Sequence, residues 1–303
     1  MVQIHATAVN VLDAKIKSGE FKPLLSYRTP LILGHDLAGT VLRIGQYVQD
    51  FKVGDEVYAR PADYRIGTFA QLIAVHQDDL AIKPNTISME EAASIPLVGL
   101  TAWQALVDKA KLQKGQKVFI QAGSGGVGTF AIQLAKYLGA TVATTTGTNN
   151  IDWVKNLGAD IVIDYKQDNF ENILREYDVV LHSQDAETLE KSLRILKPGG
   201  KLISISGPPD PAFAKKAGLP WFMKIVMGVL SWRARASAKR QRASYSFLFM
   251  QASGNELREI SKLIDSGMIR PVIDRVFPFE STNDALQYVE QGRSKGKVVI
   301  RVH

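Results

Sequence analysis

The chain has 303 residues, of which 46% are hydrophobic and 22% charged, so it is an ordinary globular protein long enough for two domains. It has no cysteine, which excludes disulfides and thiolate metal sites and fits a reducing cytoplasm. No stretch reaches about 18 apolar residues and the start lacks a signal-peptide pattern, so neither a spanning helix nor secretion is expected. The net charge is +7, and five basic residues fall in 233–242, which we interpret first as a solvated helix face. Nucleic-acid binding is disfavoured because no aromatic residues are interleaved with these charges.

Residues 1–96 are expected to form short strands separated by turns. The stretches GHDLAGTVLRIG, VGDEVYAR and TFAQLIAVHQDDLAIKP alternate apolar or β-branched residues with Gly and Asp. This pattern predicts a compact, partly open β-barrel. From Met89 the spacing of apolar residues becomes helical, and Ser88 and Glu91 have the spacing of a capping box.

Residues 97–246 alternate strands with helices, which predicts a doubly wound parallel sheet covered on both faces, a Rossmann domain of the α/β class. The strands are expected at 117–122, 141–146, 159–164, 177–183 and 201–207. The helices between them are expected at 127–138, 150–157, 169–175 and 187–200.

The regular alternation stops after Gly207, and residues 208–242 read as an insertion. Within it, WFMKIVMGVLSW (221–232) is apolar nearly all round, and the basic run follows at once. One interpretation is a helix packed as a lid or buried in a dimer contact. The alternative is an interfacial helix that contacts a membrane through 219–242, with arginines on anionic lipid.

A strand is expected again at 245–250, after the insertion. The tail, 247–303, then reads as helix, strand, helix and strand, and we expect it to return and complete the first domain.

The stretch AGSGGVG places Gly123, Gly125 and Gly128 as G-x-G-x-x-G directly after a strand and at the start of a helix. This context predicts a dinucleotide site rather than a tight turn without a ligand. Gly123 is expected to permit the tight turn, Gly125 to let the backbone approach a pyrophosphate, and Gly128 to let the helix pack on the strand. The amides of Gly126 and Val127 would then point at phosphate oxygens along the helix dipole.

The end of the second strand indicates which dinucleotide binds. An NAD site usually has an acid there to accept both ribose hydroxyls, but this chain has TTTGTNN at 144–150. Small hydroxyls admit a 2′-phosphate that a carboxylate would repel. The sequence therefore favours NADPH as the cofactor.

An ordered set of motifs extends this assignment over nearly the whole chain: HATAVNVLDAKIKSG, LGHDLAGTV, VGDEVYA, GLTAWQAL, AGSGGVG, LKPGGKLISIS and GKVVIRV. With these motifs the chain resembles the medium-chain dehydrogenase/reductase superfamily, in its zinc-independent quinone and enone oxidoreductase branch. The resemblance implies a GroES-like barrel domain joined to the Rossmann domain, with the active site in the cleft between them. It also implies a homodimer formed through the edge of the Rossmann sheet.

The sequence departs from the family in two places. Asn10 stands where zinc-dependent relatives have a cysteine, and of their ligands only His35 remains, so no metal is expected. We expect His35 to be a barrel-core residue hydrogen-bonded to its neighbours. Relatives usually also have further residues ahead of Val2, which implies that early strands of the barrel are missing from this chain.

The resemblance assigns the remaining site residues. Asn10, Lys15 and Tyr64 are the expected catalytic donors to a substrate carbonyl, with Tyr58 as an alternative to Tyr64. Lys15 is also expected to reach the bound nucleotide. The cofactor-binding residues are expected at strand ends and in the loops beside them: Thr101, Gly123, Gly125, Gly126, Val127, Gly128, Thr146, Thr148, Tyr165, Ser206, Gly207, Phe247 and Phe249.

The expected function is NADPH-dependent reduction of a small quinone or α,β-unsaturated carbonyl by metal-free hydride transfer. Positioned donors would stabilise the charge that develops on the carbonyl oxygen. The alternative is a low-turnover NADPH-binding sensor, or an RNA- or membrane-associated protein on the same fold. The basic insertion favours this alternative, and the set Asn10, Lys15, Thr101 and 125–128 favours the enzyme.

Overall fold

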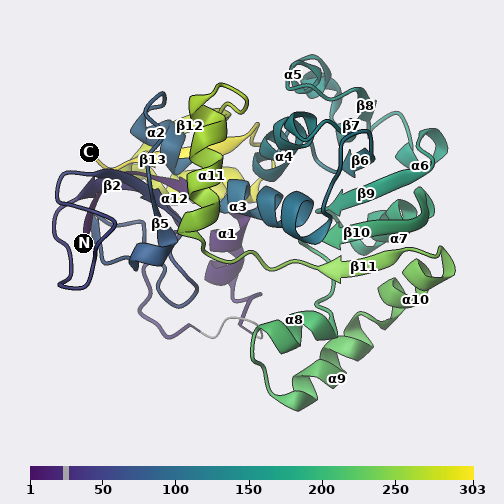
Figure 1. Ribbon diagram of the computed structural model, residues 1–303, viewed down its shortest axis with the longest axis horizontal. Helices are drawn as coiled ribbons and strands as arrows, with labels where there is room; N and C mark the ends of the chain where they lie inside the picture. The colour runs from purple at the N-terminus through teal and green to yellow at the C-terminus, as the bar shows by residue number, and fades with distance from the viewer. Residues whose placement is uncertain (23–26) are drawn as a thin grey trace. The chain divides into compact units, whose positions relative to one another are not determined.

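The computed structural model describes residues 1–22 and 27–303 (Figure 1). Contacts divide the chain into two compact units, which we call unit 1 and unit 2. Unit 1 consists of Met1–Leu100 and Met250–His303, and unit 2 consists of Thr101–Phe249.

Unit 1 is built on a mostly antiparallel sheet in which the described residues form seven strands in the order β12-β13-β1-β2-β3-β5, with β4 paired to β1. β1 is antiparallel to both β2 and β13, so strands from the beginning and the end of the sequence are neighbours. The strands are β1 (Val2–Val9), β2 (Asp36–Val41), β3 (Glu56–Ala59), β4 (Leu72–Ile73), β5 (Leu80–Ile82), β12 (Ile273–Pro278) and β13 (Lys297–Arg301).

The helices of unit 1 pack against this sheet around two hydrophobic clusters. One cluster surrounds Ile4, Leu37 and Val57, and the other joins α12 to β13 through Leu286 and Ile300. The helices are α1 (Val11–Ser18), α2 (Met89–Ala93), α11 (Gly254–Asp265) and α12 (Thr282–Glu290), while α3 (Pro96–Trp103) crosses the boundary between the units.

The predicted capping box is confirmed at the start of α2. The backbone amide of Ser88 donates to Glu91 Oε2 at 2.8 Å, and the amide of Glu91 donates to Ser88 Oγ at 3.2 Å. Two backbone donors that the helix itself cannot satisfy are thus paired.

Unit 2 is built on a parallel sheet of six described strands in the order β11-β10-β9-β6-β7-β8. The first strand along the chain, β6, lies inside the sheet, and the order reverses between β6 and β9 as in dinucleotide-binding folds. The α/β class and the parallel sheet predicted from the sequence are confirmed. The strands are β6 (Lys117–Ile120), β7 (Thr141–Thr146), β8 (Ile161–Asp164), β9 (Tyr177–His182), β10 (Leu196–Ser204) and β11 (Ser244–Phe247).

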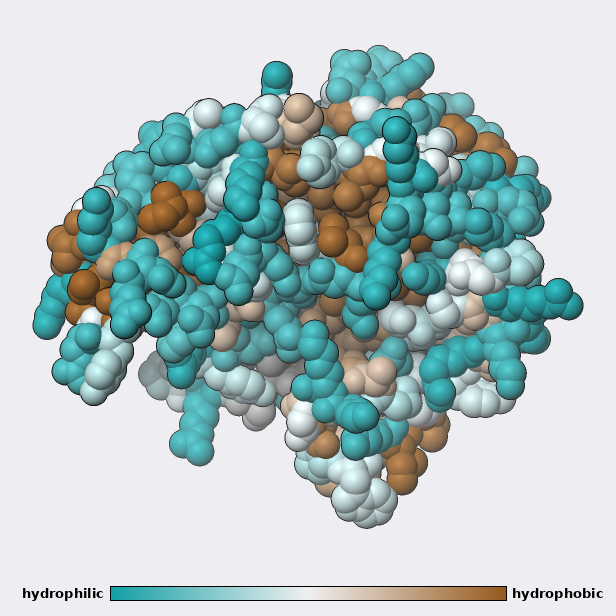
Figure 2. Space-filling view, in the orientation of Figure 1, coloured by the Kyte–Doolittle hydropathy of each residue, from teal (hydrophilic) through white to brown (hydrophobic). Residues whose placement is uncertain are grey.

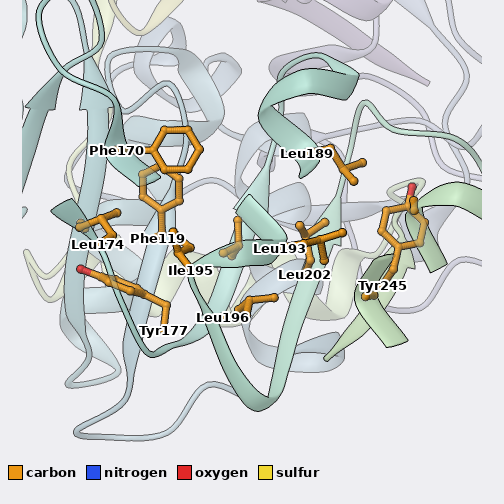
Figure 3. Packing of buried hydrophobic residues seen from close by; sticks show 14 of the residues in the cluster. Phe119, Phe170, Leu174, Tyr177, Leu189, Leu193, Ile195, Leu196, Leu202 and Tyr245 are labelled. Atoms are coloured by element: carbon orange, nitrogen blue, oxygen red, sulfur yellow. The ribbon is translucent and has the colours of Figure 1, made fainter. Parts of the chain in front are cut away.

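The core of unit 2 explains why its strands read as continuous apolar runs, because helices cover both faces of the sheet. Figure 3 shows one side of this core, where the rings of Phe119 and Phe170 lie 4.7 Å apart and Leu174, Tyr177 and Ile195 lie beside them. The helices are α4 (Gly126–Tyr137), α5 (Ile151–Asn156), α6 (Phe170–Ile173), α7 (Ala186–Arg194), α8 (Pro211–Lys216), α9 (Trp221–Leu230) and α10 (Trp232–Arg240).

Several boundaries differ from the sequence-based expectation, and the largest differences lie around β10. The helix expected over 187–200 ends at Arg194, and β10 begins at Leu196. Pro198 explains the difference, because its ring would clash with the carbonyl of Arg194 and it favours extended backbone at Lys197. The strand expected over 201–207 likewise ends at Ser204, so Ser206 and Gly207 lie in the loop after it.

Candidate functional site

The loop between β6 and α4 presents the start of a helix at the carboxyl end of the sheet. Gly125 is the N-cap in an extended conformation, and the first bond of the helix runs from Thr129 N to Gly125 O at 2.9 Å. The amides of Gly126, Val127 and Gly128 precede that bond, so the helix offers them no carbonyl. Together with the helix dipole, these amides form a site suited to phosphate oxygens.

Close packing, against the backbone at Gly128 and against side chains at Gly123, explains two of the three glycines in this loop. A Cβ on Gly128 would lie 2.2 Å from the carbonyl oxygen of Ala122, and a Cβ on Gly123 would lie 2.3 Å from Thr144 Oγ1. The role expected for Gly123 is therefore corrected: the left-handed residue of the turn is Ala122, with φ of 52°, and Gly123 is required by its contact with β7. Gly125 has more room, since its Cβ would meet Ala122 O at 3.3 Å.

The end of β7 carries small hydroxyl side chains, as the sequence indicates. Thr146 is 1% exposed, and its Oγ1 has no hydrogen-bond partner within the described part of the chain. Thr148 Oγ1 donates to Asp164 Oδ2 at 2.6 Å. Tyr165 is 62% exposed, and its ring and the Lys166 side chain both come within 4 Å of a Cβ position on Gly147. A phosphate-sized group beside Gly147 would therefore meet the Tyr165 hydroxyl and the Lys166 side chain, whereas the Thr148 hydroxyl is already bound to the Asp164 carboxylate.

Asp164 is a residue of this region that the sequence-based prediction missed. Asp164 is the last residue of β8 and lies opposite Thr146 on the neighbouring strand. The sequence-based prediction considers a ribose-binding acid only at the end of β7. The Thr148 hydroxyl, and then the Lys166 amide at 3.0 Å, hold the pKa of Asp164 below its usual value. The carboxylate is thus ionised at neutral pH, with both of its oxygens already hydrogen-bonded.

The ends of β9 and β10 are joined by a chain of hydrogen bonds. His182 Nε2 lies 3.0 Å from the carbonyl oxygen of Asp185, which only accepts, so this nitrogen carries the proton. His182 Nδ1 then accepts from Ser204 Oγ at 2.8 Å, and Ser204 Oγ accepts from Gly207 N at 2.7 Å. Burial lowers the pKa of His182 to about 4, so the imidazole is neutral at physiological pH. Because this series of hydrogen bonds ends at the backbone amide of Gly207, it fixes the loop that contains Ser206. Ser206 Oγ donates to Gln184 O at 2.6 Å.

The last cofactor residues expected from the sequence lie around β11 and in α3. Phe247 ends β11, is 5% exposed, and its amide donates to Asp210 Oδ2 at 3.0 Å. The rings of Phe247 and Phe249 both lie near Phe213, at 5.3 and 5.8 Å. Thr101 is buried in α3. Phe247 and Thr101 are thus buried and Phe249 is half-buried, and their contacts with the cofactor remain a prediction.

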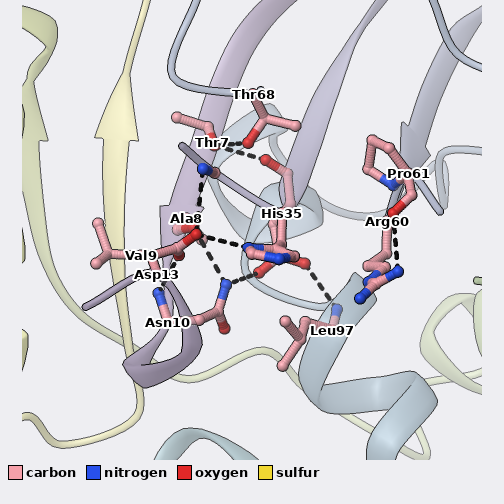
Figure 4. A network of polar contacts seen from close by, with 12 residues as sticks. Thr7, Ala8, Val9, Asn10, Asp13, His35, Arg60, Pro61, Thr68 and Leu97 are labelled. Carbon is pink, nitrogen blue, oxygen red and sulfur yellow. Dashed lines mark hydrogen bonds and ion pairs between the residues drawn. The ribbon is translucent and has the colours of Figure 1, made fainter. Parts of the chain in front are cut away.

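In unit 1, Asn10 belongs to a buried polar network (Figure 4). Its Nδ2 donates to Asp36 Oδ2 at 2.8 Å, and its Oδ1 accepts from Lys297 Nζ at 2.5 Å. Lys297 also donates to Val9 O at 3.1 Å and lies 3.3 Å from Asp36 Oδ2. The second oxygen of Asp36 accepts from the amide of Leu97 at 2.7 Å. Sequence reasoning missed Lys297, which supplies the cation that balances Asp36.

His35 lies beside this network, fully buried as expected for a core residue. Its Nδ1 lies 2.6 Å from Asp13 Oδ1, and Asp13 Oδ2 accepts from the amide of Asn10 at 2.8 Å. His35 Nε2 has no hydrogen-bond partner among residues 1–22 and 27–303. Within the same residues, no three His, Asp or Glu side chains are grouped so that they could hold a metal ion.

The other two catalytic candidates are accessible on unit 1. Lys15 extends from α1 with Nζ 3.8 Å from Glu20 Oε2, and both side chains are well exposed, so this ion pair holds the lysine only weakly. Tyr64 is 62% exposed and adopts φ of 65°, and its ring lies 5.4 Å from that of Tyr27 at an interplanar angle of 49°. The alternative donor Tyr58 is excluded, because its buried hydroxyl donates to Leu257 O at 2.6 Å.

Comparison with known proteins agrees with this geometry. Residues 1–85 match the family described as alcohol dehydrogenase GroES-like domain, and residues 157–300 match the family described as zinc-binding dehydrogenase. The mitochondrial NAD(P)H oxidoreductase RTN4IP1 of Danio rerio is 33% identical over all of this chain and 83% of its own length. The chloroplastic NADPH-dependent alkenal/one oxidoreductase of Arabidopsis thaliana is 33% identical over 99% of this chain and 71% of its own length.

A solved structure with the same architecture is the quinone oxidoreductase from Coxiella burnetii. It superposes with a TM-score of 0.84 at 29% identity, covering all of this chain and 90% of that one. The similarity therefore covers the residues of both units. The chain belongs to the medium-chain dehydrogenase/reductase superfamily, in its branch of NAD(P)H-dependent quinone and alkenal/one oxidoreductases.

Proposed function

We propose that this protein is an NADPH-dependent reductase of quinones or α,β-unsaturated carbonyls that works by metal-free hydride transfer. The observation that carries the proposal is the β6–α4 loop. It leaves three helix-start amides at the point where the strand order reverses, and Gly128 has no room for a side chain there. The relatives named above as NADPH-dependent alkenal/one oxidoreductase and quinone oxidoreductase support the same activity.

The residues of unit 2 fit this cofactor. Gly126, Val127 and Gly128 would hold the pyrophosphate through their amides, and the hydroxyl of Thr146, which has no partner among the described residues, offers a buried donor at the end of β7. When bound, NADPH supplies the hydride that reduces the substrate. We assign the 2′-phosphate to the region around Gly147, where Thr148, Tyr165 and Lys166 lie.

On unit 1 we propose three residues that act toward the substrate: Asn10, Lys15 and Tyr64. The Nδ2 of Asn10 already donates to Asp36 Oδ2 and to Ala8 O, and its Oδ1 accepts from Lys297, so we assign Asn10 a positioning role and the donor role to Lys15 and Tyr64. Lys15 and Tyr64 carry exposed donor groups, which we propose bind the carbonyl oxygen of the substrate. A donor at that oxygen lowers the barrier by stabilising the negative charge that develops there.

The proposal is tested by steady-state turnover. Loss of NADPH absorbance is followed with a panel of small quinones and alkenals, and NADPH and NADH are titrated by fluorescence. We expect turnover and tighter binding of NADPH than of NADH. Tight NADPH binding without turnover of any substrate would contradict the reductase, and failure of both nucleotides to bind would contradict the role of the glycine loop.

We further propose a homodimer and a cytoplasmic location. β11 is the edge strand of the unit 2 sheet, with pairing partners on one side only among the described strands, and edge strands readily pair with a second copy. Sedimentation equilibrium tests the dimer. The absence of cysteine supports a reducing compartment, although the two curated relatives above are named mitochondrial and chloroplastic. Cell fractionation tests the location.

A further inference from the structure

The positive charge of this protein is concentrated in one segment. Residues 211–242 contain eight Lys and Arg and no Asp or Glu. Because the whole chain has a net charge of +7, the remainder carries a net charge of −1. The basic character of the protein is therefore a property of residues 211–242, which include the helices α8, α9 and α10, and the function proposed above makes no use of it.

The same segment exposes a continuous apolar face. Trp221 and Val229 on α9 are 73% and 71% exposed, and Trp232 at the start of α10 is 63% exposed. Helical spacing places the exposed apolar residues of α9 on one side, while Met227 points inward and is 2% exposed. The face consists of Trp221, Phe222, Ile225, Val226, Val229, Leu230 and Trp232. Figure 2 shows hydrophobic residues gathered at the lower end of the view, where Figure 1 draws α9.

The helices that carry this face are anchored to the core of unit 2. Ala234 and Ala238 of α10 are part of the hydrophobic core of unit 2, and Ser237 Oγ donates to Glu190 Oε2 at 2.6 Å. Arg235 extends back to the end of α9, where its Nη2 donates to Gly228 O at 2.8 Å. The apolar residues therefore remain exposed although the helix that carries them is anchored.

We propose that α9 and α10 dock the protein on an anionic lipid bilayer. The apolar face of α9 enters the boundary between headgroups and acyl chains, and the basic residues of α10 contact the lipid phosphates. α9 has ten residues, about 15 Å of helix, so it lies in the plane of the surface rather than across a hydrocarbon core of about 30 Å. Among the described residues, no helix is long and apolar enough to span a membrane.

The positive charge of residues 211–242 favours a lipid surface over a second copy of the chain as the partner of this apolar face. In a twofold dimer the same surface would face itself, so the basic residues of α10 would approach those of a second α10, with no acid from residues 211–242 to separate them. Like charges brought together across an interface oppose association. An anionic bilayer can bury the exposed apolar side chains of α9 and neutralise the positive charge of α10.

The apolar contribution is tested by co-sedimentation of the full chain with sucrose-loaded vesicles of phosphatidylcholine, with and without phosphatidylglycerol. The variant Trp221→Ser/Val229→Ser removes two highly exposed side chains, so its thermal unfolding should match the wild type. We expect its partition coefficient to fall roughly tenfold or more. The matched control Tyr47→Ser/Val53→Ser removes exposed apolar residues from unit 1, 82% and 60% exposed, and should bind as the wild type does.

The electrostatic contribution is tested in the same assay with Lys239→Gln/Arg240→Gln. We expect roughly tenfold weaker binding to vesicles that contain phosphatidylglycerol, and loss of binding at high salt. Arg43→Gln/Lys52→Gln, which removes two exposed charges from unit 1, is the control and should leave binding unchanged.

Three results would overturn the proposal. The wild type could fail to sediment with anionic vesicles, or bind neutral vesicles equally well. The Trp221→Ser/Val229→Ser variant could keep full vesicle binding and instead lose a self-association seen by sedimentation equilibrium, which would assign the face to a second copy. A single-stranded RNA that binds equally well to the wild type and to this variant, in a protein that ignores vesicles, would assign the charge to nucleic acid.

Discussion

The ammonium of Lys297 stabilises the interior of unit 1, and replacing it with methionine tests this. Lys297→Met keeps an unbranched side chain of similar length and removes the charge. Asp36, 0% exposed, would then keep only Asn10 Nδ2 and the Leu97 amide as donors. Removing one partner of a buried ion pair costs about 3–5 kcal/mol, because the other charge is left buried and unpaired. The three donor contacts of Lys297, at about 1 kcal/mol each, give a similar figure.

Urea unfolding measures this cost. We expect the midpoint to fall with little change in the slope, because the surface exposed on unfolding is unchanged. The double variant Lys297→Met/Asp36→Asn should cost less than the sum of the single variants by about 1–3 kcal/mol. Lys295→Met, an exposed lysine two residues away, is the control and should change stability by less than about 0.5 kcal/mol. A cost below about 1 kcal/mol for Lys297→Met, or strict additivity in the double variant, would refute the coupling.

Three further predictions concern unit 2. Gly128→Ala should weaken NADPH binding roughly tenfold or more and lower the melting temperature, because the new Cβ lies 2.2 Å from a backbone oxygen. Gly125→Ala should keep the wild-type melting temperature, and equal melting of the two variants would contradict the packing argument. Lys166→Gln should raise the Kd for NADPH and leave that for NADH unchanged, by fluorescence titration, while equal changes would remove Lys166 from the 2′-phosphate site. The pKa of His182 is about 4 in the folded chain and about 6.5 in the unfolded chain, so protonation favours unfolding. The free energy of unfolding should therefore fall by about 3 kcal/mol as the pH decreases from about 6.5 to about 4. His182→Gln should remove that part of the dependence in urea titrations, and an unchanged difference between wild type and variant from about pH 7 to about pH 4 would refute it.

Local periodicity was sufficient to predict the regular elements. The strand Thr141–Thr146 has the predicted bounds, and the capping box of Ser88 and Glu91 forms as its spacing indicates. In both cases the determining interactions lie within one element or between close neighbours in sequence. The glycine loop also follows this rule in its position after β6 and before α4.

The site could be predicted only in part, because its polar contacts join distant segments. Lys297 and Asp36 are 261 residues apart, and a single lysine near the end of the sequence gives no signal that it is buried. The contact of Gly123 with Thr144, and that of Asp164 with Thr148, likewise depend on strand order, which a loop motif does not contain. Such contacts can be assigned only after the sheet is assembled.

The arrangement of unit 1 has a consequence for synthesis of the protein. All six strands of the unit 2 sheet come from one uninterrupted stretch, whereas β1 needs β13, and Val9 and Lys297 are 288 residues apart. On the ribosome, the unit 2 sheet is complete before β12 and β13 have been translated, so unit 2 can fold first. At that stage the edge of β1 that pairs with β13 has no partner strand. The Asp36 carboxylate can pair with the Lys297 ammonium only after β13 has been translated. A nascent chain arrested before Lys297 should therefore hold a folded unit 2 beside an unfinished unit 1 that chaperones would recognise.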